Sequence, residues 1–83
     1  MQFIDILRTQ SLDRFIQVEQ LMFNRDNTTR TKRTGIMKVG NMKWENIRHF
    51  EYKNVCQIVP CEKNGKKYLF IQVDERGKSF FNR

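Results

Sequence analysis

Residues 55–83 read VCQIVPCEKNGKKYLFIQVDERGKSFFNR, and this stretch decides the fold. Two apolar runs flank Asn64-Gly65, a dipeptide that accepts the positive φ angles of a type I′ turn. A second turn at residues 74–77 leads into a short apolar run at residues 79–81. The pattern predicts a three-stranded antiparallel meander on which the rest of the chain packs.

A two-residue turn pairs Lys63 with Lys66, and strand alternation then divides the hairpin into two faces. One face is aliphatic and is expected to be the core side: Cys56, Ile58, Pro60, Leu69, Ile71 and Val73. The other combines aromatic and polar side chains: Gln57, Val59, Cys61, Tyr68, Phe70 and Gln72. A four-residue loop at 74–77 would place Phe81 beside Phe70.

The chain has 83 residues, which predicts a single domain, 1–83, that buries roughly 60% of its unfolded surface. Lys and Arg outnumber Asp and Glu by 16 to 9. Residues 1–24 hold two basic and three acidic residues, a net charge of −1, so residues 25–83 hold 14 basic and 6 acidic residues, a net charge of +8. This asymmetry favours a polyanionic partner.

No segment is apolar enough to span a bilayer, and no signal peptide opens the chain, so we expect no membrane association. Cys56 and Cys61 would lie on opposite faces of one strand and cannot readily form a disulfide. The expected location is therefore the reducing cytoplasm.

The segment 1–24 is predicted to be helical. Ser11 is a suitable N-cap for a helix from Leu12 to Phe23, whose apolar side chains would cover a sheet face. Residues 2–8 fit a helical turn or a short strand, and we favour the helix. Glu19 lies inside the apolar arc, where it either pairs with a Lys or Arg of the sheet or serves as a functional carboxylate.

Residues 25–35 are predicted to be a polar, basic linker. Arg25, Arg30, Lys32 and Arg33 are separated there by Thr and Asn. The segment is either a solvated loop or a mobile arm that docks on phosphates, since hydroxyl and amide groups also donate to phosphate oxygens.

Residues 36–83 are expected to form the antiparallel sheet. A turn at Gly40-Asn41 would close a hairpin with Met37, Val39, Met42 and Trp44 on its core face. Lys38 and Lys43 would then lie opposite each other on the outer face, where an anion would relieve their repulsion. The alternative is a short helix over residues 42–50.

Catalytic and metal-binding patterns find little support. His49 has no obvious nucleophile beside it in the sequence, although a dyad with Cys56 is conceivable. His49, Cys56 and Cys61 lack the regular spacing of zinc ligands. We therefore expect no enzyme activity, no metal and no cofactor.

Tyr68, Phe70 and Phe81 would form an aromatic platform with basic residues near its ends. Aromatic rings among cations suit single-stranded nucleic acid, because bases stack and phosphates meet the positive charges. A basic antiparallel sheet could instead enter a duplex groove. If the helix covered this face, the same aromatics would simply be core.

The sequence thus predicts an α+β fold: an N-terminal helix packed on a four- to five-stranded antiparallel sheet that ends in a three-stranded meander. The predicted function is non-enzymatic nucleic-acid binding, DNA or RNA. The alternative is a small regulatory or inhibitory protein that presents the aromatic face to an acidic protein surface. An uncovered strand at residues 79–81 further predicts a homodimer. The candidate nucleic-acid contacts are Arg25, Arg30, Lys32, Arg33, Lys38, Lys43, Lys63, Lys66, Lys67, Tyr68, Phe70, Arg76, Lys78 and Phe81.

Overall fold

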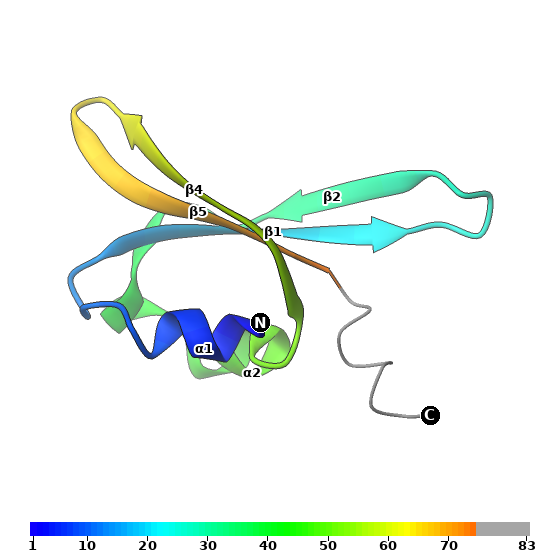
Figure 1. Ribbon diagram of the computed structural model, residues 1–83. Coiled ribbons are helices and arrows are strands. Elements are labelled where there is room, and N and C mark those ends of the chain that lie inside the picture. Colours follow the sequence, from blue (N-terminus) through cyan, green and yellow to red (C-terminus); the bar gives the residue numbers. More distant parts are fainter. Residues whose placement is uncertain (75–83) are drawn as a thin grey trace.

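The computed structural model describes residues 1–74 and shows an α+β fold, with a mixed five-stranded sheet and two short α-helices (Figure 1). In chain order the elements are α1 (Phe3–Leu7), β1 (Phe15–Phe23), β2 (Thr29–Arg33), β3 (Met37–Lys38), the 3₁₀ turn η1 (Val39–Asn41), α2 (Trp44–Phe50), β4 (Asn54–Lys63) and β5 (Lys66–Asp74). None of the helices in residues 1–74 is long and apolar enough to cross a membrane.

The sheet has the order β2-β1-β5-β4, and the short β3 pairs with the first residues of β1. The two central strands, β1 and β5, run parallel, while the other pairs are antiparallel. The prediction of a wholly antiparallel sheet is therefore wrong at its centre. After β2 the chain passes beneath the sheet through α2 and returns at the far edge, which is the crossover that parallel strands need (Figure 1).

The β4–β5 hairpin has the predicted turn. Asn64 and Gly65 both adopt positive φ, 53° and 78°, and Lys63 pairs with Lys66. The predicted register holds as far as Gln57 and then shifts, because Cys56 occupies a bulge and Val55 pairs with Val73. The predicted third strand of the meander, residues 79–81, lies outside the described residues.

The predicted helix from Leu12 to Phe23 is wrong: residues 15–23 form β1, in the middle of the sheet. Ser11 stabilises a single turn and not a helix. Its hydroxyl accepts a hydrogen bond from the Asp13 N–H at 3.2 Å, and the chain becomes extended shortly afterwards, at the start of β1. The preference for helix in residues 2–8 is confirmed by α1. Gln2 and Asp5 form a capping box at its start, with the Gln2 N–H donating to Asp5 at 3.0 Å.

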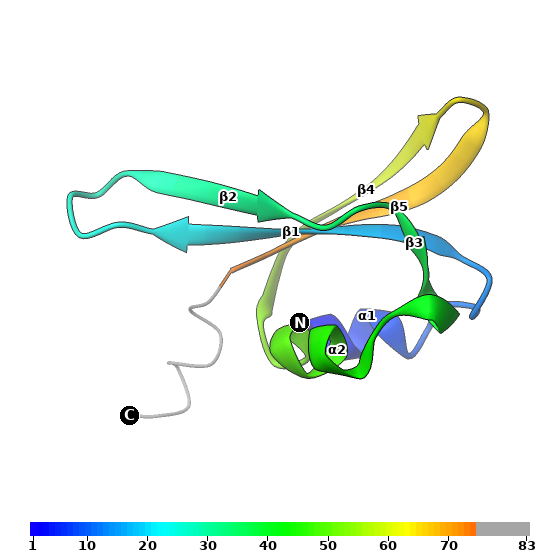
Figure 2. The same cartoon turned by 180° about the vertical axis from the view of Figure 1, so that it is seen from behind.

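Both helices lie on one side of the sheet and form the core with it (Figures 1 and 2). The core residues are Phe3, Ile6, Ile16, Val18, Val39, Met42, Phe50, Leu69, Ile71 and Val73. The aliphatic face of β5 is thus buried as predicted, but Cys56, Ile58 and Pro60 of β4 are exposed. Their strand is the edge of the described sheet, so it has packing partners on one flank only.

The predicted hairpin at Gly40-Asn41 does not form, and its alternative, the short helix, is correct as α2. Because β3 pairs with β1 instead, Lys38 is not opposite Lys43, which is the N-cap of α2. Trp44 is 65% exposed rather than in the core. Gly40 lies so close to Leu12 that its N–H donates to the Leu12 carbonyl at 2.8 Å.

Residues 25–35 are not an unstructured linker, because β2 pairs with β1 over five residues. The two strands project beyond the helices as a two-stranded ribbon, with the β4–β5 hairpin rising on the opposite side of the sheet centre (Figures 1 and 2). The Asn24–Thr28 turn closes the ribbon: the N–H and the hydroxyl of Thr28 donate to Asp26 Oδ1 at 3.1 and 2.6 Å. The basic arm is therefore built on paired strands.

Candidate nucleic-acid interface

The sheet face turned away from the helices, which we call the open face, carries the predicted aromatic side chains. Tyr68 and Phe70 alternate along β5 with the buried Leu69 and Ile71, so they point away from the core. Both are half-buried. Neither α-helix covers this side, as Figure 1 shows. The interpretation of the aromatics as core beneath a helix is therefore wrong for the described residues.

Phe15 extends this aromatic surface and was not predicted. It precedes the buried Ile16 on β1, and the parallel pairing of Ile16 with Leu69 brings it to the end of the sheet where β5 begins. The ammonium groups of Lys38 and Lys66 lie 5.8 and 5.6 Å from the centre of its ring. These distances are within the range of cation–π attraction.

A shallow hollow of about 400 Å³ lies beside Phe15. Its lining combines apolar, aromatic and basic side chains: Phe15, Ile36, Lys63, Asn64, Lys66 and Tyr68. Desolvation and the neighbouring Cys61 thiol raise the pKa of Tyr68, so its phenol stays neutral and can donate a hydrogen bond. Among residues 1–74, the lining of the hollow offers aromatic surface and positive charge and includes no carboxylate.

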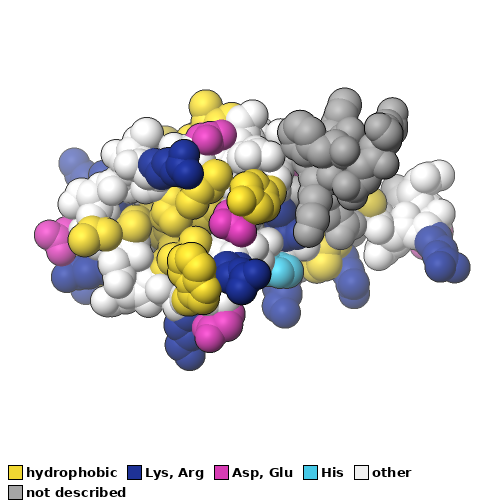
Figure 3. Space-filling view, turned by 90° about the horizontal axis from the view of Figure 1, so that it is seen from below, with side chains coloured by type: hydrophobic (Ala, Val, Ile, Leu, Met, Phe, Trp, Pro, Cys, Tyr) yellow, Lys and Arg dark blue, Asp and Glu magenta, His cyan; other side chains and the backbone are white. Residues whose placement is uncertain are grey.

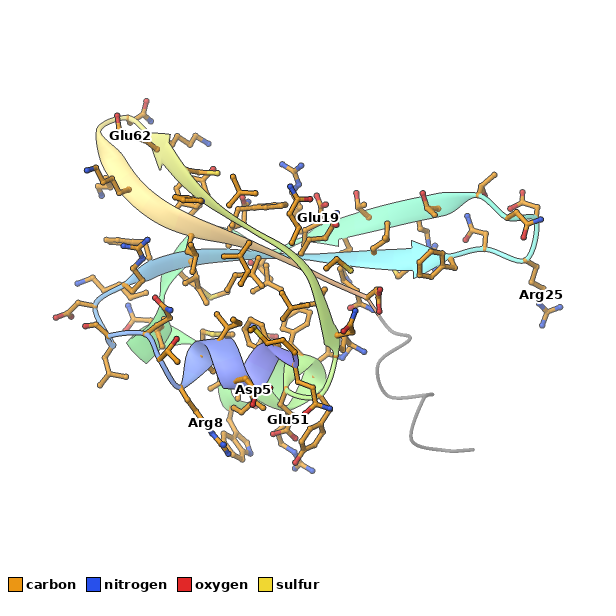
Figure 4. All side chains as sticks on the ribbon, in the orientation of Figure 1. Asp5, Arg8, Glu19, Arg25, Glu51 and Glu62 are labelled. Carbon is orange, nitrogen blue, oxygen red and sulfur yellow. The ribbon has the colours of Figure 1, made fainter. Side chains whose placement is uncertain are left out.

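The middle of the open face holds Glu19, Arg33, Phe70 and Gln72. The Arg33 guanidinium lies 5.4 Å from the centre of the Phe70 ring and donates from Nε to Glu19 Oε2. Gln72 Nε2 donates to Glu19 Oε1 at 2.8 Å. Figure 4 shows Glu19 on the side of the sheet opposite the helices. Glu19 pairs with a cation as predicted, but it does so from a buried position on β1, and its partner Arg33 comes from the segment that was predicted to be a linker.

Glu19 is only 5% exposed, yet it is held as a carboxylate. Burial raises its pKa, but the hydrogen bonds from Arg33 and Gln72, together with the charge of Arg33, lower it more, so the pKa of Glu19 lies below its ordinary value. The Arg33 side chain remains 61% exposed. Its charge is thus partly balanced within the protein while its outer surface stays accessible.

The ribbon carries the other predicted arginines and lysines. All five residues of β2 are exposed. Side chains alternate along β2, so Arg33 lies on the open face and Lys32 lies on the helix side. Arg30, two residues before Lys32, also lies on the helix side. Arg25 lies at the tip, where Figure 4 shows it pointing away from the body.

The structure thus brings together only some of the predicted contacts. Arg33, Lys38, Lys63, Lys66, Tyr68 and Phe70 gather on the open face with Phe15. Lys43 is the N-cap of α2 and lies on the other side of the sheet. Lys67 faces the same side as Leu69, and its cross-strand neighbour in the hairpin is Glu62. Arg76, Lys78 and Phe81 lie outside the described residues.

The residues considered for catalysis or metal binding have separate partners. His49 Nε2 is 2.9 Å from Gln20 Oε1, and the Cys56 thiol donates to Asp74 Oδ2 at 3.1 Å. Cys61 lies on β4 opposite Tyr68. Within residues 1–74, no three His, Cys, Asp or Glu side chains are grouped as a metal site would require.

Comparisons of this chain with protein-family models, with curated proteins and with solved structures found no match. The geometry of the sheet and its charges is therefore the basis for assigning a function.

Proposed function

We propose that this protein is a small, non-enzymatic nucleic-acid-binding protein that uses the open face and the adjoining basic ribbon. One observation carries the proposal: Phe15, Tyr68 and Phe70 share an open sheet face, and cations lie over two of their rings. Aromatic surface gives bases a place to stack, and adjacent cations meet the phosphates that follow each base.

The cations over the rings come from long side chains of exposed or half-buried residues. A base that stacks on Phe15 would displace the ammonium groups of Lys38 and Lys66, which can then swing to the flanking phosphates. Because a duplex hides the faces of its bases, this arrangement favours a single strand over a double one. The ribbon, whose exposed Arg and Lys side chains face both sides, would extend the contact along the backbone.

The charges on the open face are mostly positive, which favours a polyanion as the binding partner. Glu19 is the carboxylate nearest its centre, and Arg33 and Gln72 already engage both of its oxygens. Asp74, at the end of the neighbouring strand β5, is fully buried. Lys63 and Lys66 line the hollow beside Phe15, Lys38 lies over the Phe15 ring, and the described residues of the hollow include no carboxylate. Cys56 and Cys61 are not joined by a disulfide, which suits the proposed cytoplasmic location.

The test is the affinity for a fluorescent single-stranded oligonucleotide, measured by anisotropy for wild type, Phe15→Leu and Trp44→Leu. Loss of one stacking ring should weaken binding by about fivefold to 150-fold, the equivalent of roughly 1–3 kcal/mol. Trp44 is the matched control, because it is 65% exposed but lies on α2, across the sheet from the open face. Equal losses in the two variants, or no binding at low salt, would contradict the proposal and favour the protein-target alternative.

The salt dependence supplies a second measurement. Replacing Lys38 and Lys66 together by Gln should flatten the slope of log K against log salt by about 1.4, or roughly 0.7 for each lost phosphate contact. Lys43→Gln with Lys67→Gln changes net charge by the same amount on the other side of the molecule. If both double variants flatten the slope equally, the contact is diffuse and the open face is not the site.

A further inference from the structure

The helix side of the sheet has a basic cleft that shares Lys32 and Arg33 with the ribbon of the proposed nucleic-acid interface. Where the ribbon passes α2, a cavity of about 140 Å³ is lined by Gln20, Lys32, Arg33, Thr34, Asn46, His49 and Phe50. A neighbouring hollow of about 230 Å³ is lined by Arg48, His49, Tyr52 and Lys53. His49 belongs to both linings, and Lys and Arg side chains are at the surface on this side of the molecule (Figure 3).

The charges that line these two spaces are positive. Lys32 and Arg33 come from β2, and Arg48 and Lys53 come from α2 and the turn that follows it. Among the described residues, neither lining includes a carboxylate. Arg33 is already paired with Glu19, whereas Lys32, Arg48 and Lys53 form no ion pair with any carboxylate of residues 1–74.

His49 is oriented for an anion by its hydrogen bond to Gln20. The Gln20 carbonyl oxygen accepts from Nε2 at 2.9 Å, which places the proton of the neutral ring on Nε2 and leaves Nδ1 unprotonated. Gln20 is itself 9% exposed, and the edge of the His49 ring contacts Phe50 with centroids 4.9 Å apart. The ring is therefore fixed on one side, and protonation at Nδ1 would create a second N–H donor.

The electrostatics of His49 agree with this geometry. Burial lowers the pKa of His49, and the positive charges of Lys53 and Lys32 lower it further. The other titratable groups in the two linings are Arg33, Arg48 and Tyr52, none of which supplies a negative charge at neutral pH. A bound anion would reverse the local potential and stabilise the imidazolium.

We propose that this cleft binds a phosphate-class oxyanion between Lys32, Lys53 and His49, with the Asn46 amide as a further donor. Ammonium and imidazolium groups are suitable donors to phosphate oxygens. Each of the two spaces that meet at His49 is smaller than the roughly 300–1,000 Å³ of sites for larger organic ligands, which favours a small ion or a single phosphate group. The site shares Lys32 with the ribbon of the proposed function, but His49 and Lys53 lie on the helix side of the sheet, across from the aromatic rings of the open face.

The experiment follows the imidazole signals of His49 by NMR, since it is the single histidine in the sequence. Inorganic phosphate is titrated at constant ionic strength, with chloride as the control, and the His49 pKa is measured at both ends of the titration. Phosphate should give a saturable shift and raise the His49 pKa. Lys32→Gln and Lys53→Gln should each weaken binding by about fivefold, whereas Lys43→Gln should leave it unchanged.

Identical responses to phosphate and chloride would overturn the proposal, as would phosphate binding that neither the Lys32 nor the Lys53 variant weakens. A single-stranded oligonucleotide then identifies the source of the anion. If it displaces phosphate from His49, the cleft takes a backbone phosphate; if phosphate stays bound, the cleft takes free phosphate. Loss of oligonucleotide binding in Phe15→Leu with normal phosphate binding separates the two sites.

Discussion

Replacing Glu19 by Gln tests the electrostatics of the open face, because it removes one charge and leaves the shape of the side chain. In the wild type, the carboxylate accepts from Arg33 and from Gln72. In the variant, the Gln72 amide can rotate so that its oxygen accepts a hydrogen bond from the new Gln side chain. Arg33 can still donate to the carbonyl oxygen of that new side chain. Both hydrogen bonds survive as bonds to a neutral partner.

The size of the effect follows from these contacts. A hydrogen bond to a charged group contributes about 1.5–3 kcal/mol and a neutral one about 0.5–1.5, so the Gln72 bond loses roughly 1–1.5 kcal/mol. The Arg33 bond keeps its charged donor and loses only the ion pair of an exposed guanidinium, roughly 0.2–1 kcal/mol. Relief of the desolvation of the buried carboxylate offsets part of this loss. Arg33 is 61% exposed, so losing its partner does not strand a buried charge. We expect a net destabilisation of about 1–2 kcal/mol, equivalent to a fall in Tm of roughly 5–15 °C.

The pH dependence has a defined sign. The folded-state pKa of Glu19 lies below its ordinary value, so the carboxylate stabilises the folded protein above the unfolded-state pKa. This contribution is lost as the pH falls through the folded-state pKa. The difference in stability between wild type and Glu19→Gln should therefore be full at neutral pH and shrink below about pH 4.

Urea unfolding followed by circular dichroism measures the stability difference at each pH, and oligonucleotide anisotropy measures binding. Since the variant removes the negative charge that balances Arg33, affinity at low salt should rise and the salt slope should steepen by about 0.7, the value for one added phosphate contact. A stability difference that grows as the pH falls would refute the assigned role of Glu19. Weaker oligonucleotide binding by the folded variant would refute the role of Arg33 on the open face.

Three further predictions concern the fold and its assembly. Ile71→Ala should destabilise the protein by about 2–5 kcal/mol in urea unfolding, whereas Ile58→Ala, its cross-strand partner at 39% exposure, should cost only about 1 kcal/mol. Equal losses would mean that the helices do not cover this face as described. Gly65→Ala should cost about 1 kcal/mol because φ is +78°, and Gly35→Ala, which has open space around it and no positive φ, should be nearly neutral; the reverse order would exclude the type I′ turn. Sedimentation over a micromolar concentration range should show a dimer of the 10.1 kDa chain, and the mass of one chain at every concentration would contradict it.

The part of the fold that local chemistry determines was predictable from the sequence. Asn64-Gly65 specifies its own turn, the turn sets the register of the hairpin, and the register divides aliphatic from aromatic side chains. Tyr68 and Phe70 could therefore be assigned to a face before the structure was known. The register shift at Cys56 could not be predicted, because a bulge depends on how the strand end meets the rest of the sheet.

The errors arose where non-local pairing decided the structure. The apolar residues between Phe15 and Phe23 fit one side of a helix as well as a strand, and the parallel partner β5 lies far away in sequence. The prediction of a helix there concealed Phe15 as a member of the open face. The exposed β2 has no apolar pattern of its own and is ordered by its hydrogen bonds to β1, so residues 25–35 read as a linker.

The measurement that tests the central claim most directly is an NMR titration with a single-stranded oligonucleotide at low salt. If bases stack on the open face, the ring signals of Phe15, Tyr68 and Phe70 should move together and saturably, through the ring currents of the bases. The ring signals of Trp44 on α2 should stay in place. Shifts that appear at Trp44 and not on the open face, or no shifts at all, would contradict the account.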